Sequence, residues 1–535
     1  MPDDPSDCYS RPDGDGIKLS PAEMQTLIDE LMTIRHQLLA AGQQVPDTIH
    51  PEFKPSATNL LHYLALRQQD LRTLQGALAE LGLSSLGRSE AHVLATVDAV
   101  LATLCRLTGI LGDAGPGGDV PVSFQRGAQC LQEHASRLLA GPEEPSKVHI
   151  MVTMPTEAAI DEQLIHDLLV NGMDCARINC AHDGPAEWSA MIRNLRRAQR
   201  TTGRSCRIMM DLAGPKLRTG PVTVGPDVLK YRPRRDVYGR VVEPARIWVS
   251  DDLILHPAPA AADGSLQVDD DWLAGLESGD TVKFRDTRDA NRRLRVAAVT
   301  SEGCWLEGGK TAYLDNGVML YHHCEGDRRV SGTFVSGIPA IENYLRLFSG
   351  DRLILTADAY PGEPAKYDGS GLVLAPARTS CTLPEILEQV SAGESIWFDD
   401  GKIGGIVEKA ETDSLQIKIT HANAGGSKLR SDKGINLPDS SLELPALTRK
   451  DRADLEFVAT HADIVALSFA NTAEDVRSLK QALDQVGEGQ PAIVLKIETM
   501  AGFRHLPDML LEAMSSPACG VMIARGDLAV ESGFE

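Results

Sequence analysis

Charged residues stand at the ends of several short apolar runs in this sequence. The run "DCARINCAH" carries Arg177 and Asn179, "SCRIMMD" closes on Asp211, and "PAIVLKIE" closes on Lys496 and Glu498. In parallel α/β sheets the carboxyl ends of the strands meet at one edge, where ligands bind and catalytic groups gather. If these runs are neighbouring parallel strands, their polar ends face one crevice.

The residue types in that crevice suit chemistry on anions. It would hold the cations Arg177, Arg218 and Lys496 and the carboxylates Glu498 and Asp527, which ends "GVMIARGD". Two carboxylates suit Mg²⁺ or Mn²⁺ better than zinc. Arginine and lysine beside such a metal can stabilise phosphoryl or enolate charge. Each residue alone could belong to a structural ion pair, so the functional interpretation depends on their coincidence at matching strand ends.

The elements that must position these residues alternate regularly along the chain. Strand-like segments at 147–155, 174–182 and 205–220 alternate with amphipathic helical patterns at 157–171 and 185–202; the same rhythm returns with strands at 462–469, 491–498 and 520–527 and helices around 472–487 and 502–513. Strands and helices alternating at short intervals predict βαβ units and a parallel sheet.

The N-terminal part predicts a separate helical domain. Residues 1–17 are polar and predicted to be disordered, and residues 18–145 carry helical patterns at 20–42, 57–82, 86–111 and 123–140. Ser20 as N-cap, Pro21 at the first helical position and Glu23 form a capping-box signature. This domain contains no catalytic constellation, so we expect a helical bundle, with oligomerisation or docking as the alternative role.

A segment rich in Gly, Pro and Asp separates the two series of βαβ units. It spans about 221–432 and contains a weak internal repeat. "SDDLILHPA" (250–258) resembles "GDRLILTAD" (350–358), and "LESGDTVKFRD" (276–286) resembles "VSAGESIWFDD" (390–400). The repeat predicts two related β modules inserted after the third strand; chance similarity between β-rich segments is the alternative.

Composition excludes several classes of protein. The net charge of −22 argues against non-specific binding to nucleic acid or anionic membranes. The ten cysteines include no Cys-x-x-Cys pair, which favours reduced thiols in a cytoplasmic protein over a disulfide framework or zinc site. The acidic start "MPDDPSDCYS" is unlike a signal peptide, and no apolar stretch predicts a membrane span.

At this point the motifs resemble those of the pyruvate kinase family, through 147–220 and 396–535. "CARINCAH", "MDLAGPKLRTG", "FDDGKI", "GINLPDSSLELPALTRKDRADLEF", "LKIET" and "MIARGDLAVE" are each similar to a family motif. The resemblance implies an α/β fold: a TIM (β/α)₈-type barrel with six of its eight strands present, an inserted β-rich lid domain and the all-α N-terminal domain. The barrel would occupy 146–220 and 433–535, and the lid 221–432.

The resemblance also implies roles for individual residues. Arg177 and Lys496 would stabilise the transferring phosphoryl group, with Arg218 supporting substrate binding. Glu498 and Asp527 would hold Mg²⁺ or Mn²⁺. The backbone N–H groups at a helix start would receive the substrate carboxylate. The further positions that it assigns are Ala524, Arg525, Gly526 and Asp527 for the substrate, and His182, Asp399 and Asp400 for the nucleotide and the mobile lid.

The family's monovalent-cation site is altered in this sequence. Asn179 and Asp211 match it, but Ala181 stands where the family has Ser, and Lys216 where it usually has Glu. A lysine ammonium can take the place and charge of K⁺. The resemblance therefore implies that K⁺ is not required; the alternative is that Lys216 merely pairs with Asp211.

The implied function is pyruvate kinase activity, the last step of glycolysis. Phosphoenolpyruvate and ADP would give pyruvate and ATP, in an enzyme that is a homo-oligomer at full length, with no nucleic-acid or membrane partner. The family's seventh strand, with a catalytic Thr, and its eighth are absent, so we expect the chain ending at Glu535 to be a fragment. The alternatives are a non-catalytic phosphoenolpyruvate-binding or regulatory protein and a metal-dependent lyase or aldolase acting on the pyruvate enolate.

Overall fold

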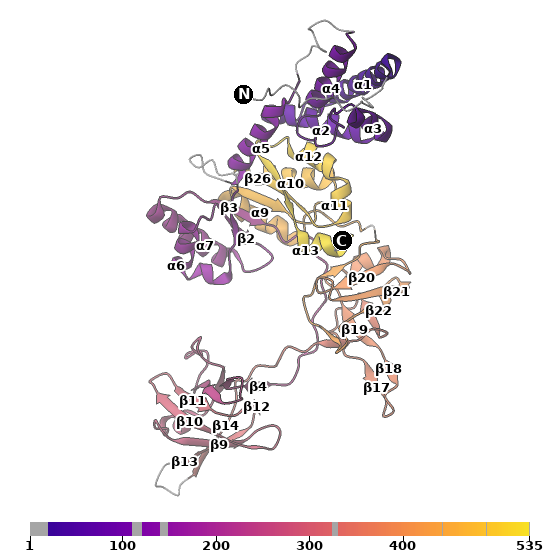
Figure 1. The fold of residues 1–535 in the computed structure, drawn as a ribbon. Coiled ribbons are helices and arrows are strands. Elements are labelled where there is room, and N and C mark those ends of the chain that lie inside the picture. The colour runs from indigo at the N-terminus through magenta and orange to yellow at the C-terminus, as the bar shows by residue number, and fades with distance from the viewer. Residues whose placement is uncertain are drawn as a thin grey trace, which may run out of the picture. The chain divides into compact units, whose positions relative to one another are not determined.

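The computed structural model describes residues 20–109, 120–139, 148–323, 330–440, 442–487 and 489–533 (Figure 1). The segment 1–17, predicted to be disordered, lies outside these residues. The chain divides into two compact units: Met1–Leu217 with Asn436–Glu535, and Arg218–Ile435. Each unit is described by itself below.

The first unit is built around a parallel sheet. Its order is β1-β2-β3-β25-β26-β27, and every neighbouring pair is parallel. The strands are β1 (Met151–Thr153), β2 (Cys175–Asn179), β3 (Arg207–Asp211), β25 (Ile464–Leu467), β26 (Ala492–Ile497) and β27 (Cys519–Ile523). These are the six barrel strands expected from the sequence, so the predicted α/β class is confirmed.

Helices cover the outer face of this sheet. Successive strand residues point to opposite faces, so every second side chain packs against these helices. Ala176 and Ile178 pack outward in one buried cluster with Trp188 of the helix that follows β2. The covering helices are α6 (Glu162–Val170), α7 (Pro185–Thr202), α9 (Arg449–His461), α10 (Ala473–Val486), α11 (Met500–Arg504) and α12 (Leu506–Ala513), and α13 (Arg525–Ser532) follows β27.

The inner face of the sheet is apolar at its amino end and polar at its carboxyl end. Cys175, Met209, Ala466 and Val494 form a small buried cluster with Leu138, near the end of α5 (Phe124–Leu139). Two residues further along each strand, on the same face, come the polar side chains of the candidate site. One helix thus closes the amino end of this face, and its chemistry begins at the other end.

Three of the expected helices differ from those observed. The pattern at 57–82 gives two helices, α2 (Lys54–Arg67) and α3 (Arg72–Glu80), separated where Asp70 accepts a hydrogen bond from the Arg72 N–H. The pattern at 157–171 gives a 3₁₀ turn, η2 (Thr156–Ala159), before α6, and the pattern at 502–513 gives α11 and α12. Local polar caps and Pro507, which lies in the first turn of α12 and has no N–H to donate to the preceding helix, end helices that periodicity alone would join.

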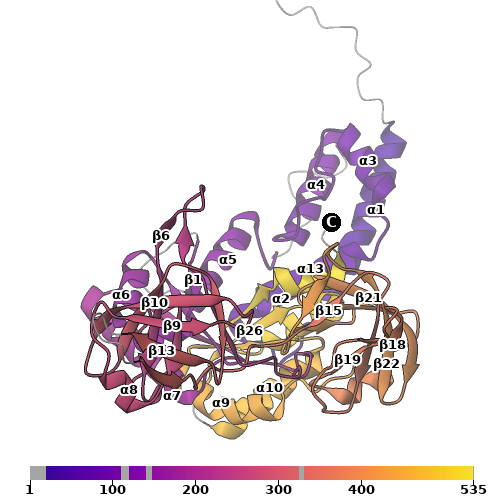
Figure 2. The same ribbon diagram turned by 90° about the horizontal axis from the view of Figure 1, so that it is seen from below.

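The N-terminal helices form a bundle, seen at the upper right in Figure 2. It contains α1 (Pro21–Gly42), η1 (Pro51–Phe53), α2, α3 and α4 (Val93–Thr108). The predicted capping box is confirmed, since Ser20 Oγ accepts from Glu23 N–H at 3.2 Å and Glu23 Oε2 accepts from Ser20 N–H at 2.6 Å. In the described part of the chain, no helix has the length and apolar character to cross a membrane.

The second unit contains two β modules. The first β module, residues 228–338, has a seven-stranded sheet of order β14-β13-β9-β10-β11-β7-β8. Its elements are β4 (Val228–Tyr231), β5 (Arg234–Arg235), β6 (Val241–Glu243), β7 (Ala245–Ser250), β8 (Gly264–Gln267), α8 (Asp270–Ala274), β9 (Thr281–Arg285), β10 (Asn291–Val299), β11 (Cys304–Gly308), β12 (Ala312–Asp315), β13 (Met319–His323) and β14 (Val330–Phe334).

The second β module, residues 345–435, has a sheet of order β19-β16-β22-β21-β20-β24. Its elements are β15 (Leu345–Leu347), β16 (Arg352–Thr356), β17 (Lys366–Tyr367), β18 (Val373–Ala375), β19 (Ala377–Ser380), η3 (Pro384–Gln389), β20 (Ser395–Phe398), β21 (Ile403–Glu411), β22 (Ser414–His421), β23 (Ser427–Leu429) and β24 (Ile435–Asn436). In both modules alternate residues along the strands are buried in a core, as expected when successive side chains of a strand point to opposite faces.

The two sequence repeats behave differently in the structure. In 276–286 and 390–400 a glycine turn leads into β9 and β20 respectively. In 250–258 the apolar residues follow the end of β7 and Ile254 is 91% exposed, whereas their partners in 350–358 lie in β16 with Leu353 and Leu355 buried. The first repeat pair was therefore matched in the wrong register, because similar apolar runs can occupy a strand in one place and a surface turn in another.

Candidate active site

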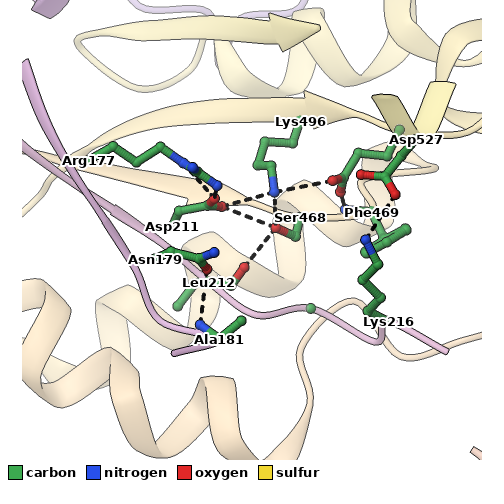
Figure 3. A network of polar contacts seen from close by, with 12 residues as sticks. Arg177, Asn179, Ala181, Asp211, Leu212, Lys216, Ser468, Phe469, Lys496 and Asp527 are labelled. Atoms are coloured by element: carbon green, nitrogen blue, oxygen red, sulfur yellow. Dashed lines mark hydrogen bonds and ion pairs between the residues drawn. The ribbon is translucent and has the colours of Figure 1, made fainter. Parts of the chain in front are cut away.

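Arg177 and Asp211 form the first part of a buried polar network at the carboxyl end of the inner sheet face (Figure 3). Arg177 Nη1 donates to Thr153 Oγ1 at 2.8 Å, and its Nε donates to Asp211 Oδ2 at 2.9 Å. Arg177 Nη2 also donates to Asp211 Oδ2. A guanidinium held from β1 and β3 is fixed in orientation, with a partly exposed side for a ligand.

Lys496 connects the neighbouring strands. Its Nζ donates to Ser468 Oγ at 2.7 Å and lies 3.2 Å from both Asp211 Oδ1 and Glu498 Oε1. The Lys496 side chain is 9% exposed, so its charge requires these partners. The ammonium thus lies between two carboxylates, fixed by polar groups from β3 and from the residues directly after β25 and β26.

Glu498 is held by a backbone donor as well as by Lys496. The Phe469 N–H donates to Glu498 Oε2 at 2.7 Å, from a residue whose φ of 54° is unusual for a non-glycine. Burial raises the pKa of Glu498 above its ordinary value, and the nearby Asp527 raises it further, while Lys496 and the Phe469 N–H oppose the rise. Additional positive charge would stabilise the ionised form of a buried carboxylate that lies near a second carboxylate.

Lys216 pairs with Asp527 in the structure. The Lys216 Nζ lies 2.9 Å from Asp527 Oδ1 and 5.9 Å from the centre of the Phe469 ring. This ion pair differs from the alternative prediction, in which Lys216 pairs with Asp211. Asn179 Oδ1 accepts from the Ala181 N–H at 3.1 Å, at the turn that follows β2.

The segment from Ala524 to Asp527 starts α13. The first N–H with an intrahelical partner is that of Leu528, which donates to Ala524 C=O at 3.0 Å. The N–H groups of Arg525, Gly526 and Asp527 therefore precede the helical hydrogen-bond ladder, and such groups can bind an anion. Ala524 N–H itself donates to Ile497 C=O, which ties this helix start to β26.

Not all of the residues predicted for the site belong to this network. His182 is exposed after β2, where its carbonyl accepts from Trp188 Nε1. Arg218, Asp399 and Asp400 belong to the second unit. There Arg218 Nη1 donates to Asp432 O at 3.0 Å, and Asp399 lies 3.1 Å from Lys402 Nζ, beside a cavity of about 360 Å³.

The donor set of Glu498 and Asp527 fits a hard divalent cation. Both offer carboxylate oxygens, and the Asp527 carboxylate contributes to the raised pKa of Glu498. Among the residues that the structure describes, no group of three or more His, Cys, Asp or Glu side chains forms a metal cluster. Mg²⁺ commonly takes only one or two protein carboxylates and fills its other positions with water and substrate, so two carboxylates suffice.

Sequence reasoning missed two residues at the end of β25. Ser468 is buried, and its Oγ lies 3.1 Å from Asp211 Oδ1 and 2.7 Å from Leu212 O, which makes it the junction between β3 and Lys496. Phe469 supplies the N–H that holds Glu498. Both residues directly follow the apolar run "IVAL", so their position at a strand end, rather than a charge, is the signal that could have found them.

Comparison with known proteins supports the resemblance seen in the motifs. The family model "Pyruvate kinase, barrel domain" matches residues 145–236 and 372–535. A pyruvate kinase of Geobacillus stearothermophilus is 36% identical over 172 residues, which cover 31% of this chain and 28% of that protein. A pyruvate kinase of Methylorubrum extorquens is 34% identical over 212 residues, covering 39% and 38% respectively.

The matched part thus spans roughly a third of the length of these curated relatives. A crystal structure of a pyruvate kinase from Cryptosporidium parvum has a TM-score of 0.42 and 17% identity, covering 75% of this chain and 53% of that chain. The two matched segments include the whole polar network, from Arg177 to Asp527. By these sequence matches, residues 145–236 and 372–535 are similar to the barrel domain of pyruvate kinases.

Proposed function

We propose that this chain acts in phosphoryl transfer from phosphoenolpyruvate to ADP, giving pyruvate and ATP. The observation that carries the proposal is the position of Lys496 Nζ, 3.2 Å from Glu498 Oε1 and from Asp211 Oδ1, on the strand edge that also presents Arg177. Sequence similarity to pyruvate kinases over the barrel segments supports the same reaction.

Arg177 and Lys496 provide positive charge for the phosphoryl group in flight. Phosphoryl transfer needs positioning and charge stabilisation more than covalent help from the protein. Thr153 and Asp211 orient the Arg177 guanidinium, and Ser468 orients the Lys496 ammonium, before substrate arrives. Fixed cations need little reorganisation during the reaction, which is the main source of their catalytic effect.

Glu498 and Asp527 would hold Mg²⁺ or Mn²⁺, which when bound supplies further positive charge beside the substrate oxygens. The N–H groups at the start of α13 would receive the substrate carboxylate. Arg218 would support the substrate, and Asp399, Asp400 and His182 would act on the nucleotide side. The proton donor to the enolate is not assigned to any residue of this chain.

The remaining parts of the proposal concern conditions and setting. Lys216, beside Asp527, would supply the charge that K⁺ supplies elsewhere in the family, and Asn179 and Asp211 would be the other residues of that site, so K⁺ would not be required. The protein would act in the cytoplasm, as a homo-oligomer, in glycolysis, on small-molecule substrates rather than nucleic acid or membranes.

The test is formation of ATP from ADP and phosphoenolpyruvate by the full chain in the presence of Mg²⁺. Lys496→Met should lower the rate by at least about a thousandfold, as expected for removal of a charge made for the transition state. The control is Lys480→Met on α10, whose ammonium pairs with Glu512 away from the network. Wild-type binding of phosphoenolpyruvate without any ATP formation would overturn the catalytic proposal and indicate a binding protein.

A further inference from the structure

The two β modules of the second unit share one strand arrangement. Five strands of the first β module lie in the order β9-β10-β11-β7-β8, and five strands of the second lie in the order β20-β21-β22-β16-β19. In both, the first three neighbouring pairs are antiparallel and the last is parallel. The strands also follow the same order along the chain, so the correspondence is one of topology as well as of shape.

The turns that lead into β9 and β20, the third of the five strands along the chain in each module, form the same hydrogen bonds. Gly279 N–H donates to Val296 O at 2.8 Å, and Gly393 N–H donates to Val407 O at 2.8 Å. Asp280 Oδ2 accepts from the N–H three residues before it, as does Glu394 Oε2. Agreement of side-chain caps in a turn is unexpected for unrelated sheets of similar order.

The strand registers therefore equate individual positions of the two modules. Lys283 pairs with Arg293 across β9 and β10, as Trp397 pairs with Gly404 across β20 and β21. Thr281 pairs with Arg295 in the first module, as Ser395 pairs with Ile406 in the second. Lys283, Arg293 and Arg295 thus correspond to Trp397, Gly404 and Ile406.

These equivalent positions differ strongly in character. In the second β module these positions carry an aromatic residue, a glycine and an aliphatic residue, and a Cβ added at Gly404 would lie 2.5 Å from the Trp397 ring. In the first β module all three are exposed cations, while Val282, Phe284 and Leu294 between them are buried. The family match covers β20 to β22 and omits 237–371, so the charged version lies in the part of the chain outside the match.

We propose that the first β module is a second copy of the second β module, and that its outer face binds an acidic segment of a partner protein. The cationic face is defined as Lys283, Arg293 and Arg295, with Tyr321 beside Lys283. Within the described residues, none of these three cations forms an ion pair with a carboxylate. Tyr321 is 44% exposed and extends the face by one strand.

The cationic face is unfavourable for the module by itself. Lys283 and Arg293 lie directly opposite each other on adjacent antiparallel strands, and like charges in such positions destabilise a sheet. Glu307, opposite Arg295 and Arg246, is the acidic residue that borders this group. The second β module has no such like-charge pair at the equivalent positions. A ligand of opposite charge would explain why the first β module has one.

The charge of the whole chain favours a short acidic peptide over a long polyanion. With a net charge of −22, the protein repels a nucleic acid along most of its surface. At physiological salt, charges interact over about 8 Å, so a segment that touches only the cationic face is affected mainly by those residues. An extended strand also places alternate side chains about 7 Å apart, close to the spacing of Arg293 and Arg295 along β10.

The experiment uses the full chain and a fluorescein-labelled peptide of six glutamates, followed by fluorescence anisotropy at low and physiological salt. We expect saturable, salt-sensitive binding that weakens at least tenfold in Lys283→Gln/Arg293→Gln/Arg295→Gln. The control Arg232→Gln/Arg234→Gln/Lys310→Gln makes the same charge change on exposed residues elsewhere in the module and should bind within about twofold of wild type.

Thermal unfolding separates a binding effect from a folding effect. Because the test variant removes opposed like charges, it should unfold no earlier than wild type. Absence of saturable peptide binding, or equal weakening in the control variant, would overturn the proposal. Binding of a twenty-nucleotide polyuridine RNA at least tenfold tighter than the peptide, lost in the test variant, would also overturn it and indicate a nucleic-acid surface.

Discussion

The Lys216 ammonium lies 2.9 Å from Asp527 Oδ1, although 311 positions separate the two residues in the sequence. The pair joins the loop after β3 to the first turn of α13. It also occupies one of the two carboxylates proposed to hold a divalent cation. Lys216 and a bound metal would therefore share the Asp527 carboxylate.

Removal of this lysine should tighten metal binding. In Lys216→Gln, Asp527 loses its ammonium partner, and we expect Mn²⁺ to bind up to about tenfold more tightly, which corresponds to about 1.4 kcal/mol. Isothermal titration of the full chain with Mn²⁺ measures this, with Lys480→Gln as the control of equal charge change. Unchanged or weaker binding would show that Asp527 does not hold the metal.

Potassium should have no specific effect on the reaction. The proposed role of Lys216 predicts that the rate of ATP formation is the same in KCl and in tetramethylammonium chloride at equal ionic strength. Lys216→Gln should slow the reaction and should recover part of its rate when KCl replaces the inert salt. A many-fold stimulation of the wild-type chain by KCl would contradict the role of Lys216.

Replacing Gly214 with alanine should be more destabilising than the same change at Gly109, because only at Gly214 would the new side chain meet a close neighbour. Gly214 and Gly109 both have a φ of 68°, but a Cβ on Gly214 would lie 2.8 Å from Ser468 Cβ, whereas Gly109 has no described heavy atom within 4 Å. Alanine costs about 1–2 kcal/mol at either site through its backbone conformation. Gly214→Ala should lose clearly more stability than Gly109→Ala.

Hydrogen exchange resolved by mass spectrometry can compare these two alanine variants. The opening free energy of β3 in Gly214→Ala is compared with that of α4 in Gly109→Ala, each relative to wild type. Equal losses in the two variants would mean that the loop moves away from Ser468 at little cost.

The first β module should lose stability in acid through one carboxylate. Burial would raise the pKa of Asp286, but hydrogen bonds from Arg288, Ala290 and Arg292 outweigh it and lower this pKa to about 2. Because the folded pKa lies below the ordinary aspartate value of 3.8, the ionised group stabilises the fold above that pH. This contribution is lost as the pH falls from about 4 towards 2.

The opening free energy of β9 and β10, measured by hydrogen exchange, checks the acid effect. It should fall over that acidic range in wild type, whereas in Asp286→Asn it should be low at pH 6 and change little. Asp289→Asn, on an 82% exposed side chain, serves as the control. A wild-type protein as stable at pH 2.5 as at pH 5 would contradict the assignment.

Strand ends were predictable from the sequence because they obey a local rule. Charged residues within or directly after apolar runs located Arg177, Asp211, Lys496 and Glu498 on one edge of the sheet. The particular partners were not predictable, since the Lys216–Asp527 pair depends on how a loop and a distant helix start approach each other. The role of Ser468 was overlooked because a hydroxyl carries no charge signal, although its burial makes it the junction of the network.

Element boundaries and repeat registers were less predictable for a related reason. Periodicity detects an apolar face but not the polar contact that ends a helix, such as the Asp70 bond to Arg72 N–H between α2 and α3. The run Leu253–Leu255 looks like the interior of a strand, yet it follows the strand end, because β7 already fills the core with earlier residues.

Two sheets with the same strand order in one polypeptide have a consequence for how the chain reaches its native state. While both modules are unfolded, the β20 segment could pair with β10 in place of β9, because the two strands hold equivalent places in their sheets. Neighbouring domains of like topology are prone to such exchange. The exchanged pairing would place Trp397 against the exposed guanidinium of Arg293 and leave Lys283 against the narrow space at Gly404. Divergence at these positions keeps each strand with its own sheet and steers the nascent chain away from a hybrid fold.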